Sequence, residues 1–256
     1  MHYIWLDRET GDWSVGDWME RRGALDAAFK SLKANVVAFQ EMESFARGSA
    51  KPVNLTLDWL TENNPAYGVA AANDPAMFPS TQPILYRKDR LRSVDEGWFF
   101  FSDTPDTLYA RTYNGSYPAF ASWAIFEERE GARRFRLVNI HFDFASASNR
   151  RQSAELVAER IRPWVAAGET VLVVGDVNAG IRSTPARIIA EEGLEFVTVP
   201  GSTYHWNRGL NITPAIDHIA ATATLEATGD ATIFTRRFEG DWPSDHYPVF
   251  VDFRWK

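Results

Sequence analysis

The feature of this sequence that most constrains its fold is residues 170–178, which read Thr-Val-Leu-Val-Val-Gly-Asp-Val-Asn. The first five are β-branched or leucine, which predicts a strand buried on both faces. Gly175 removes steric bulk at the strand end, and Asp176 and Asn178, two positions apart, leave on the same side. These two side chains can contact one small ligand. The alternative is an Asp and an Asn that only open a turn by bonding their own backbone.

The length and composition are those of one folded unit. A chain of 256 residues can bury a single large core, and no linker, low-complexity run or internal repeat divides it. We expect one domain over residues 1–256. The absence of cysteine excludes disulfides, thiolate metal sites and cysteine nucleophiles. The 34 acidic side chains exceed the 27 basic ones, which disfavours broad adhesion to nucleic acid but permits a phosphate substrate held through a divalent cation.

Nothing in the sequence indicates insertion into a membrane. No apolar run approaches the ~20 residues that span a bilayer, and the N-terminus lacks the basic and apolar regions of a signal peptide. We expect a soluble monomer. Its localisation is left open, and secretion is allowed if further residues precede Met1.

Apolar periodicity predicts four helices in a strand-rich chain. Helical spacing predicts helices over 17–33, 55–63, 149–164 and 184–192. Short apolar runs predict strands over 2–6, 36–39, 83–87, 98–101, 121–127, 134–140, 170–174, 216–220 and 248–253, with 130–131 as the turn of a hairpin. Arg21, Arg22 and Lys30 are expected between the apolar positions of the first helix, and the arginines of the third helix are expected on a solvated face.

Polar side chains stand at or beside the ends of several predicted strands. Taken singly, a glutamate after a strand is usually solvated and a histidine there is usually filler. Together, however, they indicate loops that converge on one site. These residues are Glu41, His141, Asp176, Asn178, Asp217, Asp245 and His246.

The chemistry of this set favours metal-assisted hydrolysis. Carboxylates and imidazoles without cysteine suit Mg²⁺ or Mn²⁺ better than zinc. A serine-based triad is the weaker alternative, because the sequence has no Gly-x-Ser-x-Gly elbow.

Five motifs carry a resemblance to a known family. Gln40-Glu41, His141-x-Asp143, Gly175-Asp176-Val177-Asn178, Ile216-Asp217-His218-Ile219 and the segment 244–249 (Ser-Asp-His-Tyr-Pro-Val) resemble, in order, the motifs of the endonuclease/exonuclease/phosphatase superfamily. They cover the chain from about residue 18 to its end. The resemblance implies an α/β (α+β) fold like that of deoxyribonuclease I. This is a four-layer α/β/β/α sandwich of two mainly antiparallel, mixed sheets with outer helices.

The resemblance also implies roles for individual residues. Glu41 would bind a catalytic Mg²⁺ or Mn²⁺, assisted by Asp245. Asp176 would orient or deprotonate the attacking water, and Asn178 would hold a phosphate oxygen. His246, oriented by Asp217, would contact the scissile phosphate, and His141 would stabilise the charge of the transition state. In-line attack at phosphorus needs an aligned oxygen nucleophile and dispersed positive charge, which suits these residue types.

Further candidates for contact with the substrate lie outside these motifs. Arg150 is placed at a helix start, and His205 lies in the polar aromatic loop 202–206. A short basic groove could draw on Arg87, Arg111, Arg150 or Arg182. Specificity is expected to reside in the loops 68–81, 102–119 and 201–214.

Two departures from the family pattern weaken the transfer of these roles. The first strand of the family carries an Asn that helps to bind metal or phosphate, but this chain shows His2-Tyr3-Ile4 where that strand should be ending. Many relatives also place a Glu before Pro83, where this chain has Ser80-Thr81-Gln82. The partner of His141 therefore stays open.

The leading functional hypothesis is a divalent-metal-dependent phosphoester hydrolase, and more specifically a phosphodiesterase acting on nucleic acid or a small phosphodiester. A phosphomonoesterase of the same fold, acting on a sugar or lipid phosphate, is one alternative. A non-catalytic binding protein with a degraded metal site is the other.

Overall fold

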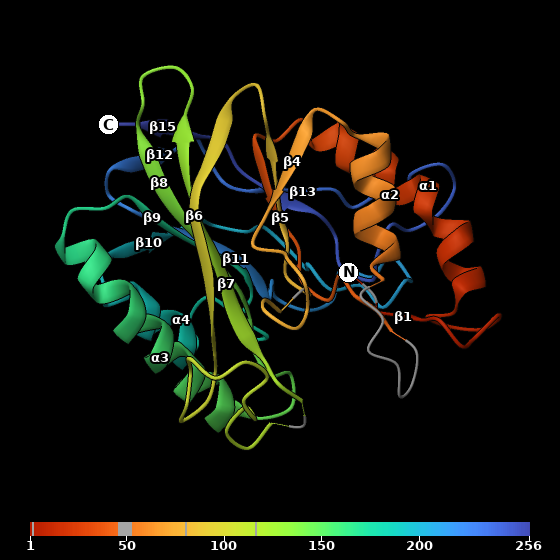
Figure 1. The fold of residues 1–256 in the computed structure, drawn as a ribbon, viewed down its shortest axis with the longest axis horizontal. Coiled ribbons are helices and arrows are strands. Elements are labelled where there is room, and N and C mark those ends of the chain that lie inside the picture. The colour runs from red at the N-terminus through yellow and green to blue at the C-terminus, as the bar shows by residue number, and fades with distance from the viewer. Residues whose placement is uncertain (2, 46–52, 80, 116) are drawn as a thin grey trace.

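The fold is a sandwich of four layers. The computed structural model describes residues 1, 3–45, 53–79, 81–115 and 117–256. Figure 1 shows two sheets held between two pairs of helices. α3 (Ala147–Ala166) and α4 (Thr184–Ala190) cover one outer face, and α1 (Val15–Leu32) and α2 (Leu55–Asn63) cover the opposite one. The expected α/β/β/α architecture is therefore confirmed.

The larger sheet has six strands in the order β10-β11-β9-β8-β7-β6. Only β8 and β9 pair in parallel, because α3 forms the crossover between them; the other neighbours are antiparallel. The predicted hairpin is confirmed as β7 and β8. The strands are β6 (Leu91–Phe100), β7 (Phe120–Glu128), β8 (Arg134–His141), β9 (Val171–Asp176), β10 (Leu194–Phe196) and β11 (Asp217–Thr222).

The second layer of strands is divided into short pieces. Its three-stranded part has the order β2-β5-β4, formed by β2 (Val36–Ala38), β5 (Ile84–Arg87) and β4 (Tyr67–Ala70). The remaining pairs are β1 (Ile4–Trp5) with β3 (Ser44–Phe45), β12 (Leu225–Ala227) with β15 (Phe253–Trp255), and β13 (Thr232–Ile233) with β14 (Val249–Phe250). An apolar cavity of about 250 Å³ is lined by residues of both β2 and β14 and reaches Asp217 and His246.

Alternating side chains divide the core into three apolar interfaces. Val138 of β8 packs in the α3 interface, whereas Leu137 packs against the small sheet. In the same way Ile84 of β5 faces the large sheet, and Leu85 faces α1 and α2. Each sheet thus buries both of its faces, which is why the chain needs helices on the two outer sides.

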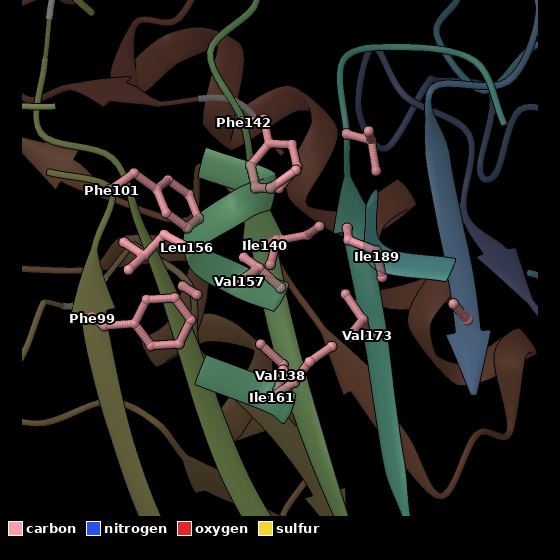
Figure 2. Close-up of a cluster of buried hydrophobic side chains, with 14 of the residues drawn as sticks. Phe99, Phe101, Val138, Ile140, Phe142, Leu156, Val157, Ile161, Val173 and Ile189 are labelled. Atoms are coloured by element: carbon pink, nitrogen blue, oxygen red, sulfur yellow. The ribbon is translucent and has the colours of Figure 1, made fainter. Parts of the chain in front are cut away.

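Figure 2 shows the first of these interfaces. Leu156, Val157 and Ile161 of α3 lie against aromatic side chains that include Phe99 and Phe142. Strand β9 lies within this core. Its residues Val171 and Val173 face α3, whereas Leu172 packs in the interface between the two sheets. The expected burial of this strand on both faces is confirmed.

The structure departs from the predicted elements in several places. The single strand expected over 248–253 is divided into β14, which pairs with β13, and β15, which pairs with β12. The fourth helix ends at Ala190 and is followed by Gly193 at a φ of +87°. Strands β3, β4, β10, β12 and β13 are short and were not expected. His2 and Ser80, which entered the family comparison, lie outside the described residues.

Among the described residues, no helix is both long and apolar enough to cross a lipid bilayer.

A buried polar clamp joins the two sheets beneath the ends of β2 and β8. Asn139 of β8 has no exposed surface, and its side-chain amide donates to the Phe39 carbonyl at 2.8 Å. Its side-chain oxygen accepts from Gln40 at 2.6 Å. Gln82, which is 2% exposed, donates to the Asn139 carbonyl at 3.0 Å, and its own carbonyl accepts from Ser122 at 2.7 Å. The clamp fixes residues 39–41 of the small sheet against the strand that carries His141.

We expect Asn139→Leu to lower the free energy of unfolding by about 2–4 kcal/mol. The leucine has a similar volume, but it leaves the buried Phe39 carbonyl and the part-buried Gln40 amide without this partner, at about 1–3 kcal/mol for a buried group and less for a part-buried one. Urea denaturation followed by circular dichroism measures the change. Asn73→Leu, at an exposed position, is the matched control and should leave the midpoint nearly unchanged. Equal effects of the two substitutions would contradict the proposed role of the clamp.

Candidate functional site

The register of the large sheet places three polar residues in one row. His141 at the end of β8 is the partner of Asp176 at the end of β9, and Asp176 is also the partner of Asp217 at the start of β11. The carboxyl ends of β8 and β9 and the amino end of β11 therefore meet at one edge. This is the convergence that the sequence predicted for these three residues.

A close contact between strands makes this row possible. Gly175 has a φ of +128°, and a Cβ atom there would lie 2.1 Å from the Ile140 carbonyl oxygen. Only glycine fits this contact without displacing backbone. Beyond it, Asn178 adopts a φ of +50°, and its backbone N–H donates to Asp176 Oδ1 at 2.7 Å. The Asn178 side-chain amide donates to the Phe142 carbonyl at 2.8 Å, which joins the loops after β8 and β9.

The turn that follows β2 brings Glu41 to the same place. Glu41 has a left-handed φ of +57°, and its Oε1 lies 3.8 Å from His141 Nε2. The same imidazole nitrogen lies 3.9 Å from Asp176 Oδ2. His141 thus stands between two carboxylates, at distances too long for direct hydrogen bonds. Burial raises the pKa of Glu41.

His246 and Asp217 form the shortest contact between two ionisable side chains of the site. The imidazole Nδ1 lies 2.8 Å from Asp217 Oδ2, and the opposite nitrogen lies 4.0 Å from Asp176 Oδ2. The loop that carries His246 is held in part by the Ser244 hydroxyl, which accepts from the His246 N–H at 3.2 Å. The hydroxyl of Thr203 accepts from the Asp217 N–H at 3.2 Å. Backbone contacts therefore hold both partners of the pair.

The two histidines have opposite electrostatics. Burial lowers the pKa of His141 to about 4, so its imidazole is neutral at pH 7. Burial would also lower the pKa of His246, but the charge and hydrogen bond of Asp217 outweigh it and raise that pKa to about 9. Burial would raise the pKa of Asp217, but the charge of His246 and their hydrogen bond lower it. The pKa of Asp176 is raised by burial and then by the charge of Asp217.

The donor set suits a hard divalent cation. One ligand atom each from Asp176, Asp217 and His246 lies within 4.8 Å of the others. Since Asp217 Oδ2 already accepts from His246, the three are better described as a hydrogen-bonded pair that faces Asp176 than as three free ligands. Burial raises the proton affinity of Asp176, and crowding by the carboxylates of Asp217 and Glu41 raises it further. A cation with oxygen ligands would relieve this crowding, so the residues fit Mg²⁺ or Mn²⁺.

The other candidate residues are placed differently. Asp245 is half-buried outside the row; its carboxylate accepts from the Ser244 hydroxyl at 3.3 Å, and its carbonyl accepts from the His205 N–H at 2.8 Å. His205 has no exposed surface, so its ring offers none to a substrate in this structure. The Nη1 of Arg150 donates hydrogen bonds to the carbonyls of Asp143 and Phe144, both at 2.9 Å, and so holds the loop after β8.

Among the arginines considered for a basic groove, Arg87 lies away from the site. Arg87 pairs with Asp89 at 2.6 Å, and its N–H donates to the Asn35 carbonyl. Asn35 precedes β2, whereas Glu41 follows it, so Arg87 lies at the opposite end of the small sheet from the site. Arg111 and Arg182 are exposed on loops.

Residues outside the motifs support the site. The clamp of Gln40, Gln82 and Asn139 supplies the contact between the sheets, and Gln82 stands where a Glu was expected from the family. Tyr3, just before β1, has its pKa raised by burial and then by the charge of Glu41.

Arg21 of α1 was expected between the apolar positions of its helix, and its side chain is only 4% exposed. Its Nε donates to Asp17 at 3.0 Å, and its Nη1 donates across 222 positions to the Pro243 carbonyl at 3.4 Å. The spacing Trp18-x-x-Arg21 was the available signal, because i and i+3 share one face of a helix. Arg21 thus attaches the first helix to the loop that carries Asp245 and His246.

The comparisons with known proteins agree with this geometry. The sequence matches the Endonuclease/Exonuclease/phosphatase family over residues 14–246, and the chain belongs to that family. A search of curated protein sequences found no match.

Solved structures share the fold along nearly the whole chain. The mannosyl-6-phosphatase of Bacteroides thetaiotaomicron superposes with a TM-score of 0.80 at 21% identity, covering 99% of this chain and 98% of that one. An endonuclease/exonuclease/phosphatase from Bacteroides vulgatus gives 0.79 at 22% identity, with coverage of 100% and 97%. TDP2 from D. rerio, complexed with a single-strand DNA product, gives 0.67 at 15% identity, with 93% of both chains covered.

The pairing of His246 with Asp217 predicts how this histidine titrates. In the metal-free protein we expect Asp217→Asn to lower the pKa of His246 by about 2 units, because the carboxylate charge is lost. The raised pKa of His246 contributes stability that is fully present below the unfolded histidine pKa of about 6.5 and is lost as pH rises through about 9. Imidazole NMR titration and urea denaturation at pH 7 and 9.5 measure both effects. An unchanged pKa in the variant would contradict the pairing.

The position of Arg21 predicts a stability effect that depends on its guanidinium. We expect Arg21→Met to lower the free energy of unfolding by about 1–3 kcal/mol, since bonds made by a charged donor are lost. Arg22→Met on the same helix is the matched control and should cost less, because Arg22 is half-exposed and packs over Trp59. Denaturation measures the stability, and the amide NMR shift of His246 should move only in the Arg21 variant.

Proposed function

We propose that this chain is a divalent-metal-dependent phosphoester hydrolase that acts on phosphodiesters by in-line attack of water. The observation that carries the proposal is the Asp217–His246 pair at 2.8 Å, facing Asp176 at 4.0 Å and close to a neutral His141. Family membership supports a hydrolase of phosphoester bonds. A bound Mg²⁺ or Mn²⁺ would supply positive charge to the phosphate oxygens and keep the surrounding carboxylates ionised.

Each side chain has a proposed task that its surroundings favour. Glu41, with Asp176 close by, is the candidate ligand for the cation, and Asp245 remains a second candidate. Asp176 has the raised proton affinity of a group that can orient or deprotonate water. The charged His246, held in orientation by Asp217, would contact a phosphate oxygen and give a proton. Asn178 and the neutral His141 would donate hydrogen bonds to oxygens that gain charge.

The charge of the site favours a diester over a monoester. The carboxylates Glu41, Asp176 and Asp217 surround one charged imidazole, and the candidate Arg150 already donates to two backbone carbonyls. A phosphodiester carries one negative charge, whereas a monoester dianion needs more positive charge around it. The phosphomonoesterase is the alternative, because a mannosyl-6-phosphatase has the same fold. The third hypothesis, a binding protein with a degraded site, is disfavoured because the proposed groups still converge.

Hydrolysis of bis-p-nitrophenyl phosphate tests the proposal. We expect turnover with Mg²⁺ or Mn²⁺, its loss on chelation, and slower turnover of the monoester p-nitrophenyl phosphate. Asp217→Asn should lower kcat by roughly 10² because His246 loses its charge partner. Its Mg²⁺ affinity, measured by calorimetry, should remain near that of the unchanged protein.

Glu41→Ala should lose both metal binding and activity. A chain that neither binds the metal nor hydrolyses either ester would instead support the binding-protein hypothesis. Faster turnover of the monoester would support the phosphomonoesterase. A fully active Asp217→Asn would refute the assigned roles.

A further inference from the structure

The loop before β11 brings two aromatic rings close to His246. Tyr204 forms an isolated antiparallel bridge with His246, and its ring centroid lies 4.9 Å from the imidazole. The ring of Trp206 lies 4.5 Å from that of Tyr204, and Trp206 is 37% exposed. Tyr204 therefore lies against both the proposed catalytic imidazole of His246 and the partly exposed ring of Trp206.

The buried residue between the two rings anchors them. His205 has no exposed surface; it stacks on Tyr247 at 4.0 Å and lies 4.6 Å from Trp242. His205 is the chain neighbour of both residues, and the 4.5 Å contact between the rings of Tyr204 and Trp206 places these two side chains together. The pair of rings thus stands on a packed aromatic support, which reduces the ordering that a ligand would have to impose.

The backbone of this loop is strained at the outer ring. Trp206 has a φ of +54° and Asn207 a φ of +55°, in the left-handed region that a bulky aromatic residue rarely adopts. Gly209 follows at +70°, where a Cβ would lie 2.6 Å from the Trp242 ring. Such strain persists only where the surroundings determine it, and it gathers at ligand sites. Here it turns a large apolar ring outward beside the proposed phosphate site.

We propose that Tyr204 and Trp206 form a stacking subsite for a planar aromatic ring, specifically a nucleobase, carried by the ester group of the substrate. The inference rests on the phosphoester function proposed above and names the substrate class as nucleotide esters. A phosphate held at His246 and a base stacked on Trp206 would be bridged by one sugar. Stacking accepts any base because every base has a π face. It also needs no basic stripe, in accord with a net charge of −7.

Binding of adenosine monophosphate and ribose 5-phosphate tests the subsite, because the two ligands share the sugar and phosphate and differ in the base. With Mg²⁺ present, isothermal titration calorimetry should give the unchanged protein about tenfold tighter binding of the nucleotide, as one stacked base implies. Trp206→Ala should bring the two affinities together. Trp206→Phe, which keeps a ring, should retain most of the preference.

Trp255→Ala is the matched control and should leave the preference intact. Trp255 donates to Glu128 near the β7–β8 hairpin turn, at the opposite end of the large sheet from the site. The proposal is overturned if the unchanged protein shows no preference for the base, or if Trp206→Ala lowers the affinity for both ligands by the same factor. Because calorimetry needs no turnover, a preserved base preference without ester hydrolysis would refute only the hydrolytic function. Hydrolysis without base preference would refute only the subsite.

Discussion

The site depends on a buried polar contact between two sheets that otherwise meet through apolar side chains. Glu41 comes from the small sheet, whereas His141, Asp176 and Asp217 come from the large one. Apolar packing alone would allow the layers to slide at small cost, since it is not directional. The side chains of Asn139 and Gln82 have fixed donors and acceptors, so they hold one register. The position of Glu41 relative to His141 is set by these bonds.

Burial and neighbouring charge give the ionisable residues of the site different proton affinities. Burial pushes the pKa of Asp176 upward, and the Asp217 carboxylate adds to that effect. The same Asp217 raises the pKa of His246. One buried carboxylate thus increases the proton affinity of both neighbours, while His141 stays neutral because burial outweighs its acidic surroundings. Four ionisable groups at one strand edge therefore hold different protonation states at one pH.

The sequence predicted the row of His141, Asp176 and Asp217 because strand periodicity and strand ends are local properties. It also predicted the four helices and the central buried strand, whose apolar patterns are strong. It did not predict the division of residues 248–253, because which strand each half pairs with is decided by distant residues. The burial of Arg21 was not predicted for a related reason. An arginine is expected to be solvated unless its partner is known, and the partner here is a carbonyl 222 positions away.

The misassignment of His205 has a similar origin, and its outcome clarifies the loop before β11. A histidine in a polar aromatic segment reads as a ligand contact, yet the burial of its ring leaves its Nε2 without a partner among the described residues. That imidazole does structural work: its Nδ1 accepts from the Gly209 N–H at 3.3 Å, and its face packs on Tyr247. His205 is therefore a buried support of this loop, whereas the next residue, Trp206, is 37% exposed.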